Sequence, residues 1–211
     1  MYKLITLGAW LITLSFPIIA DAACKTDLPY HIMDRYVDNG DGTVNDSLTG
    51  LTWMRCPLGR NWDQEKRICD TPYEGTTRLD IQDTWNRVLV ETQNLNQNGG
   101  YAGITTWRVP NIKELASLIM LHCYPPIDTS IFPDAASKTG ATKFWSSTPS
   151  RKIAQININK DKNATPIYQY HTQAWTFSLV DNQAAGKAAE TPTHEKHHVM
   201  LISGDSATGG R

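Results

Sequence analysis

Four cysteines, at positions 24, 56, 69 and 123, constrain the fold of this chain more than any other feature of its 211 residues. In an exported protein, an even number of cysteines is typical of structural disulfides, and four cysteines allow three pairings. Cys56 and Cys69 flank a polar stretch that contains proline and glycine and suits a local closed loop. We predict the bridges Cys56–Cys69 and Cys24–Cys123. The second would link the N-terminus that remains after removal of an export signal to the rest of the domain. A zinc site is disfavoured because the chain has no C-x-x-C pair.

The first 22 residues are typical of a signal peptide. Lys3 is followed by an uncharged apolar run from Leu4 to Ala20, and Ala20-Asp21-Ala22 has the small-x-small pattern of a cleavage site. The run is shorter than the ~20 residues that a membrane-spanning helix needs. We therefore expect residues 1–22 to be removed. Residues 23–211 would then form one exported domain, extracellular, at the cell surface or in the periplasm, with no membrane span.

Cys24 leaves one alternative open, because it follows the small pair Ala22-Ala23, where the cysteine of a lipoprotein would lie. Asp21 occupies the place where a lipobox normally has leucine, so a disulfide is the preferred interpretation.

The charge balance limits the class of partner. The chain has 20 basic and 21 acidic side chains, a net charge of −1, whereas a general nucleic-acid-binding protein is visibly basic. Fourteen glycines and 11 prolines indicate a turn-rich fold and disfavour a long helical bundle.

Residues 35–54 predict short strands joined by tight turns. Asn39-Gly40 and Asp41-Gly42 are strong turn signals because both pairs tolerate positive φ. The inward-facing residues should be Val44, Leu51, Trp53 and Met54. The DNGDG string also suggests a calcium loop of the EF-hand type. In the register set by Asp41-Gly42, however, Val37 and Leu48 occupy the first and last ligand positions, and neither has a side-chain oxygen, so a hairpin is favoured.

The rest of the chain predicts two helices followed by loops and short strands. Apolar residues recur at helical spacing from Leu79 to Leu95, and again from Pro110-Asn111 through Ile119. Ser146–Pro149 reads as a turn, 174–179 as a half-buried strand and 199–202 as a buried closing strand. The charged, small-residue stretch 181–196 reads as an exposed loop.

Several segments, in order, resemble the Lcl C-terminal domain family, named for the C-terminal domain of a bacterial collagen-like adhesin. The matching segments are RYVDNGDGTVNDSLTGLTWMRC (35–56), TWNRVLVETQNLN (84–96), TWRVPNIKELASLI (106–119), PPIDTSIFP (125–133), FWSSTP (144–149), AWTFSL (174–179) and HHVMLISG (197–204). The resemblance implies an α+β fold of compact C-type-lectin-like architecture, with two helices and a twisted antiparallel sheet. It also implies a surface binding domain, which in the adhesin recognises sulfated polysaccharide.

A basic cluster is the main candidate for a ligand-binding surface. Six cations lie between residues 138 and 162 with only Asp161 against them, and such a patch could meet sulfate or carboxylate groups. Trp62, within the cysteine loop, is the aromatic residue that we expect to be exposed, whereas the tryptophans at 53, 85, 107, 145 and 175 lie in patterned segments typical of a core. The basic residues are Lys138, Lys143, Arg151, Lys152, Lys160 and Lys162.

Catalytic and metal sites have weaker support. The chain has six histidines, and Ser146 and Ser147 follow a tryptophan, but no nucleophile elbow, H-E-x-x-H or paired-acid motif surrounds them. His194, His197 and His198 approach zinc spacing without a third ligand cluster nearby in the sequence. The sequence thus predicts a binding or adhesion-type module without a metal or cofactor, rather than an enzyme. Its partner would be a glycan or, alternatively, an envelope or pilus protein.

Overall fold

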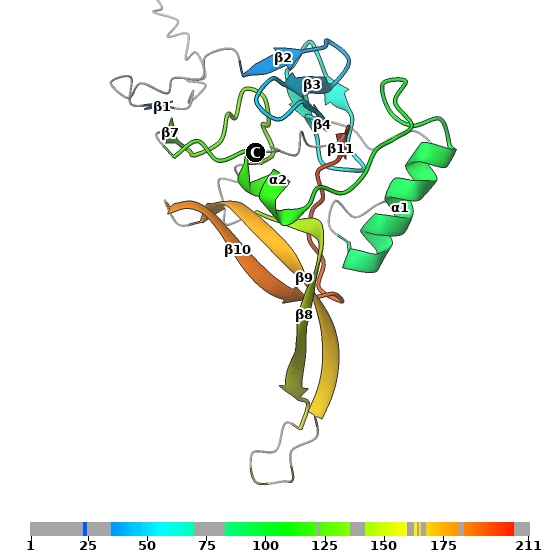
Figure 1. Cartoon of the computed structure of the whole chain (residues 1–211), viewed down its shortest axis with the longest axis vertical. Coiled ribbons are helices and arrows are strands. Elements are labelled where there is room, and N and C mark those ends of the chain that lie inside the picture. Colours follow the sequence, from blue (N-terminus) through cyan, green and yellow to red (C-terminus); the bar gives the residue numbers. More distant parts are fainter. Residues whose placement is uncertain are drawn as a thin grey trace, which may run out of the picture.

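We analysed a computed structural model of the chain, which describes residues 23–24, 35–69, 83–121, 123–135, 142–159, 163, 165, 168–181 and 184–204. The expected signal peptide, 1–22, lies outside these residues. The fold is a mixed α+β arrangement, mostly of antiparallel strands, with two helices. Figure 1 shows a body that contains both helices and the short strands, from which two long strands project. No helix among the described residues is long and apolar enough to cross a membrane.

The predicted hairpin is confirmed as part of a four-stranded antiparallel sheet of order β11-β4-β3-β2. The turn between β2 (Tyr36–Asp38) and β3 (Thr43–Asp46) contains Gly40 and Gly42, which both have positive φ. β4 (Leu51–Met54) continues the meander, and β11 (Ile202–Ser203) joins from the other end of the chain. The four residues predicted to face inward are fully buried: Val44, Leu51, Trp53 and Met54.

The first helix, α1 (Trp85–Gln97), begins later than predicted. Asp83 pairs with His197 through two backbone hydrogen bonds of 3.0 Å, which hold the chain extended just before the helix. The helix ends at the predicted Asn98-Gly99, where Gly99 has φ +96°.

The second helix, α2 (Ile112–Ala116), is much shorter than predicted, although its start is confirmed. Asn111 accepts hydrogen bonds from the backbone N–H groups of Lys113 and Glu114, and the Glu114 carboxylate accepts one from the Asn111 N–H. This reciprocal cap fixes where the helix begins. Leu115 and Leu118 are buried, so part of the predicted apolar stripe still enters the core beyond the helix.

Two predictions for the C-terminal half are wrong. Residues 146–149 do not form a turn between elements: they lie within β8 (Lys143–Asn157), which has register irregularities on either side of Pro149. The predicted loop 181–196 contains β10 (Ala184–Pro192), which pairs with β9 (Tyr168–Asp181) in a three-stranded sheet of order β10-β9-β8. Residues 199–202 are buried as expected, but the closing strand is only β11.

Gly186 explains how β10 can form from residues with low strand propensity. A Cβ atom at this position would lie 2.5 Å from Cε1 of Phe177 and 2.8 Å from Cδ1 of Ile119. The missing side chain therefore lets the backbone of β10 pass close to the core. Because part of this fit depends on Ile119, which is distant in sequence, local composition predicted a loop.

The disulfide Cys56–Cys69 is confirmed, and it closes the loop that contains the short pair β5 (Trp62–Asp63) and β6 (Ile68–Cys69). In the other two-stranded pair, β1 (Ala23–Cys24) runs antiparallel to β7 (Cys123–Tyr124), with Cys24 directly opposite Cys123. The side chain of Cys24 lies outside the described part, so the bridge Cys24–Cys123 stays a prediction.

The core consists of two apolar clusters, and both include residues of β4 in the four-stranded sheet. One cluster packs Trp53 with Phe132 and Phe144, and the other packs Trp107 with Trp145. The predicted core tryptophans at 53, 107 and 145 are thus confirmed, whereas Trp85 and Trp175 are only half-buried.

Candidate binding surface

The outer part of the β8–β9 pair forms a two-stranded ribbon that we call the arm, residues 150–157 and 168–172. β10 ends where Pro192 lies opposite Gln173, so within the named strands residues 168–172 of β9 pair with β8 alone, although the carbonyl of Thr172 also accepts the N–H of Thr193, just beyond β10. In Figure 1 the arm extends away from both helices and from the four-stranded sheet. An isolated two-stranded ribbon is at best marginally stable in water. Side chains on such a ribbon contribute little to a core, so they can serve another purpose, such as binding a partner.

The arm carries large apolar and aromatic side chains that water reaches. Ile153 is 63% exposed, Tyr168 50% and Tyr170 65%. In the antiparallel register, Ile153 lies opposite Thr172, while Tyr170 lies opposite Gln155 and Tyr168 opposite Asn157. Because residues two apart on a strand share a face, these three apolar side chains lie on one face of the arm.

Two of the predicted basic residues lie on the same ribbon. Arg151 and Lys152 are both exposed and directly precede Ile153. The Lys152 ammonium bonds the Glu190 carboxylate at 2.7 Å, and the Ser150 hydroxyl donates to the other oxygen of that carboxylate at 2.8 Å. These hydrogen bonds, from Lys152 first and Ser150 second, lower the pKa of Glu190. Arg151 has no charged partner in the described ranges and is the more available cation.

Of the other predicted cations, the described Lys143 lies apart from this pair. Lys143 is half-buried at the opposite end of β8, where its carbonyl accepts a hydrogen bond from the His198 N–H. Eight residues of strand separate Lys143 from Arg151, a path of ~25 Å if fully extended. Lys138, Lys160 and Lys162 lie outside the described residues. Among the described residues, Arg151 and Lys152 therefore lie together on the arm and Lys143 lies apart from them.

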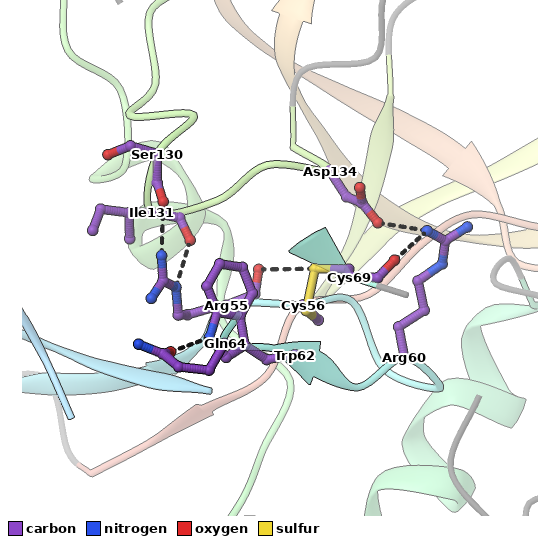
Figure 2. Close-up of a disulfide and its surroundings, with 9 residues drawn as sticks. All are labelled: Arg55, Cys56, Arg60, Trp62, Gln64, Cys69, Ser130, Ile131 and Asp134. Atoms are coloured by element: carbon purple, nitrogen blue, oxygen red, sulfur yellow. Dashed lines mark hydrogen bonds and ion pairs between the residues drawn. A yellow bond between two sulfur atoms is a disulfide. The ribbon is translucent and has the colours of Figure 1, made fainter. Parts of the chain in front are cut away.

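Trp62 is not the open aromatic surface that we expected. The Arg55 guanidinium lies 3.6 Å from the centroid of its ring, and its indole N–H donates to Oε1 of Gln64 at 2.6 Å. Figure 2 shows the indole beside Arg55, next to the disulfide. One face of the ring is therefore occupied by a cation of the protein itself.

Arg55 itself is buried and ties three segments together. Its guanidinium donates to the carbonyls of Ser130 and Ile131 at 2.7 and 3.1 Å (Figure 2). It also donates to the Asp38 carboxylate at 2.6 Å. A buried guanidinium needs this full set of acceptors. The cysteine loop is thus part of the structural framework, and the sequence pattern gave no signal of this arginine's role.

The residues of the alternative calcium loop are used in the hairpin. Asp38 accepts from the Gly40 N–H and from Arg55, and one oxygen of Asp41 accepts from both the N–H and the hydroxyl of Thr43. Groups of the turn and the Arg55 guanidinium thus bond these two carboxylates.

The hydroxyls of the WSST segment also have structural partners. Ser146 donates to the carbonyl of Trp175 at 2.8 Å, and Thr148 accepts the N–H of Ile112 at 3.0 Å. These two hydroxyls bond backbone groups and connect β8 to β9 and to the start of α2.

The histidines that approach zinc spacing in the sequence, His194, His197 and His198, do not form one cluster around a common point: His194 and His197 have different partners. His197 bonds Glu195 at 3.1 Å and its ring meets Trp145 edge-on, with centroids 4.9 Å apart. Burial lowers the pKa of His197 more than Glu195 raises it. His194 instead lies against His171, with ring centroids 4.2 Å apart. Within the described ranges, no group of three or more metal-ligating side chains is present.

Sequence reasoning missed the tyrosines of the arm. The signal was available, because Tyr168 and Tyr170 alternate with polar residues at the period of a strand. It was overlooked because the segment lies close to the basic stretch that we interpreted as a loop.

The fold and this surface together define a disulfide-bonded, strand-rich α+β domain with a projecting ribbon. The family model for the Lcl C-terminal domain matches residues 42–203, and the chain belongs to this family. The searches of curated proteins and of solved structures found no match.

Proposed function

We propose that this protein is an exported adhesion-type module that binds an anionic polysaccharide through the arm. The observation that carries the proposal is the combination, on one projecting ribbon, of exposed Tyr168 and Tyr170 with exposed Arg151 and Lys152. Membership of the Lcl C-terminal domain family supports the adhesion-type role.

The chemistry of these side chains suits a sulfated or carboxylated sugar chain. Tyrosine offers a rigid ring that covers apolar ligand surface while its hydroxyl stays hydrated, and tyrosine and arginine are enriched where proteins bind partners. The planar guanidinium of Arg151 can bond two oxygens of one anionic group. Because the surface is exposed, the charge-dependent part of the affinity should fall as salt rises.

The test is binding to immobilised sulfated polysaccharide at low and at physiological salt. Arg151→Gln with Lys152→Gln should weaken binding mainly at low salt, and Tyr168→Ser with Tyr170→Ser should weaken it at both. Lys113→Gln, which removes an exposed cation on α2, is the matched control and should bind as the parent does. Absence of binding at low salt, or an equal loss in the control, would refute the proposal.

A protein partner is the second candidate, because Ile153 and Ile158 are 63% and 50% exposed on or beside the arm. Exposed aliphatic side chains contribute little to sugar recognition but suit an apolar protein surface. Binding to an envelope protein that Ile153→Ser abolishes, without polysaccharide binding, would favour this candidate.

Three further expectations belong to the same proposal. Residues 1–22 direct export, the domain has C-type-lectin-like architecture, and its role is binding rather than catalysis. β11 pairs with β4, so strands from near the two ends of the sequence meet in one sheet, which supports the C-type-lectin-like architecture. The hydroxyls of Ser146 and Thr148 hydrogen-bond backbone groups. This supports a structural role for these hydroxyls rather than a catalytic one.

A further inference from the structure

Two histidines far apart in sequence lie side by side at the base of the arm. The β9–β10 register ends with Gln173 opposite Pro192, and the turn that follows β10 brings His194 beside His171 of β9. The two imidazole rings are in contact, with centroids 4.2 Å apart and planes inclined at 44°.

The neighbouring residues Thr172 and Thr193 hold the two segments together. The Thr193 N–H donates to the Thr172 carbonyl at 2.9 Å, and the two threonine hydroxyls bond each other at 2.8 Å. The backbone positions of both histidines are therefore fixed before any ligand arrives. Such preorganisation lowers the entropy cost of binding.

Both imidazoles are available as ligands. Across the described part of the chain, neither ring takes part in a hydrogen bond or an ion pair, and His194 is exposed while His171 is half-buried. His197 differs, because Glu195 and Trp145 already contact its ring. Imidazole nitrogen is a preferred ligand of Zn²⁺, Cu²⁺ and Ni²⁺.

We propose that His171 and His194 form a binding site for one divalent transition-metal ion. Two nitrogens on one tetrahedral ion, each at about 2.0–2.1 Å, lie ~3.4 Å apart, which two rings with this centroid separation can reach by small side-chain rotations. Two protein ligands leave two positions of a tetrahedral ion for water or for a donor group of a partner. The site does not depend on the polysaccharide proposal.

The experiment is a calorimetric titration of Zn²⁺ into the purified, disulfide-bonded protein. One saturable site is expected. His171→Gln and His194→Gln should each weaken it by at least ~10-fold, since even groups that only support a metal ligand are worth 10–100-fold. Glu195→Gln is the control: it lies beside His194 in sequence but bonds His197, and should leave the affinity unchanged.

A second readout separates loss of a ligand from loss of fold. On addition of Zn²⁺, the imidazole ¹⁵N resonances of His171 and His194 should shift together, while that of His197 should stay in place. Shifts confined to His197, loss of binding in Glu195→Gln alone, or retained affinity in both histidine variants would each overturn the proposal.

Discussion

Arg35 holds Asp46 through two parallel hydrogen bonds, Nε to Oδ1 at 2.8 Å and Nη2 to Oδ2 at 2.6 Å. Both residues are buried, one just before β2 and the other at the end of β3. The Asp46 carboxylate also accepts the Leu48 N–H and the Thr49 hydroxyl, so it organises the turn into β4. One ion pair thus joins the start of β2 to the end of β3.

Asp46→Asn should destabilise the fold by about 3–5 kcal/mol, because removing one partner of a buried pair leaves the other charge uncompensated. Urea unfolding measures the change. Asp63→Asn, which breaks the surface pair Lys66–Asp63, should change the free energy of unfolding much less, because water screens an exposed ion pair. A similar loss in both variants would contradict the assignment of Asp46 as a buried structural anion.

The same carboxylate predicts how stability depends on pH. Burial alone would raise the pKa of Asp46, but hydrogen bonds from Arg35 and Thr49 and the Arg35 charge outweigh it, and the pKa lies below its usual value. The resulting stabilisation is complete above the pKa of an unfolded aspartate, about 3.9, and is lost as pH falls through the lower folded-state value. Unfolding free energies measured from pH 6 to pH 2 should therefore fall less steeply below pH 4 in Asp46→Asn than in the parent.

Cys56→Ser with Cys69→Ser should lower the free energy of unfolding by about 3 kcal/mol, the value expected for a loop of this length. The reason is that the open chain gains conformational freedom on unfolding. With an m-value of about 1–3 kcal/mol per molar urea, the midpoint should fall by roughly 1–3 M. An unchanged midpoint would mean that the contacts of Arg55 suffice to hold the loop.

Trp62→Ala should reduce stability and leave polysaccharide affinity unchanged. Its ring covers the buried Arg55 guanidinium, and a desolvated cation–π contact is worth about 2 kcal/mol. Thermal unfolding and binding should be measured on the same preparation, with Tyr168→Ser as the opposite case. Weaker binding by a folded Trp62→Ala protein would restore Trp62 as a ligand-contacting residue.

Features whose partners lie close in the chain were determined by the sequence itself. The Asn39–Gly42 turn, the start of α2 at Asn111 and the bridge Cys56–Cys69 each depend on contacts within about 15 residues. In such segments the residue types alone restrict the backbone to a few conformations, so the sequence pattern predicts the local structure correctly.

Tertiary structure decided what depends on distant partners. Gly186 lets β10 pass close to Ile119, the carbonyls of Ser130 and Ile131 hold the Arg55 guanidinium, and His171 meets His194 beside the β9–β10 pair. The arm arises in the same way, since β8 extends beyond the last residue of β10. Local propensity carries no information about these pairings, because their free energy comes from surfaces that only the folded chain brings together.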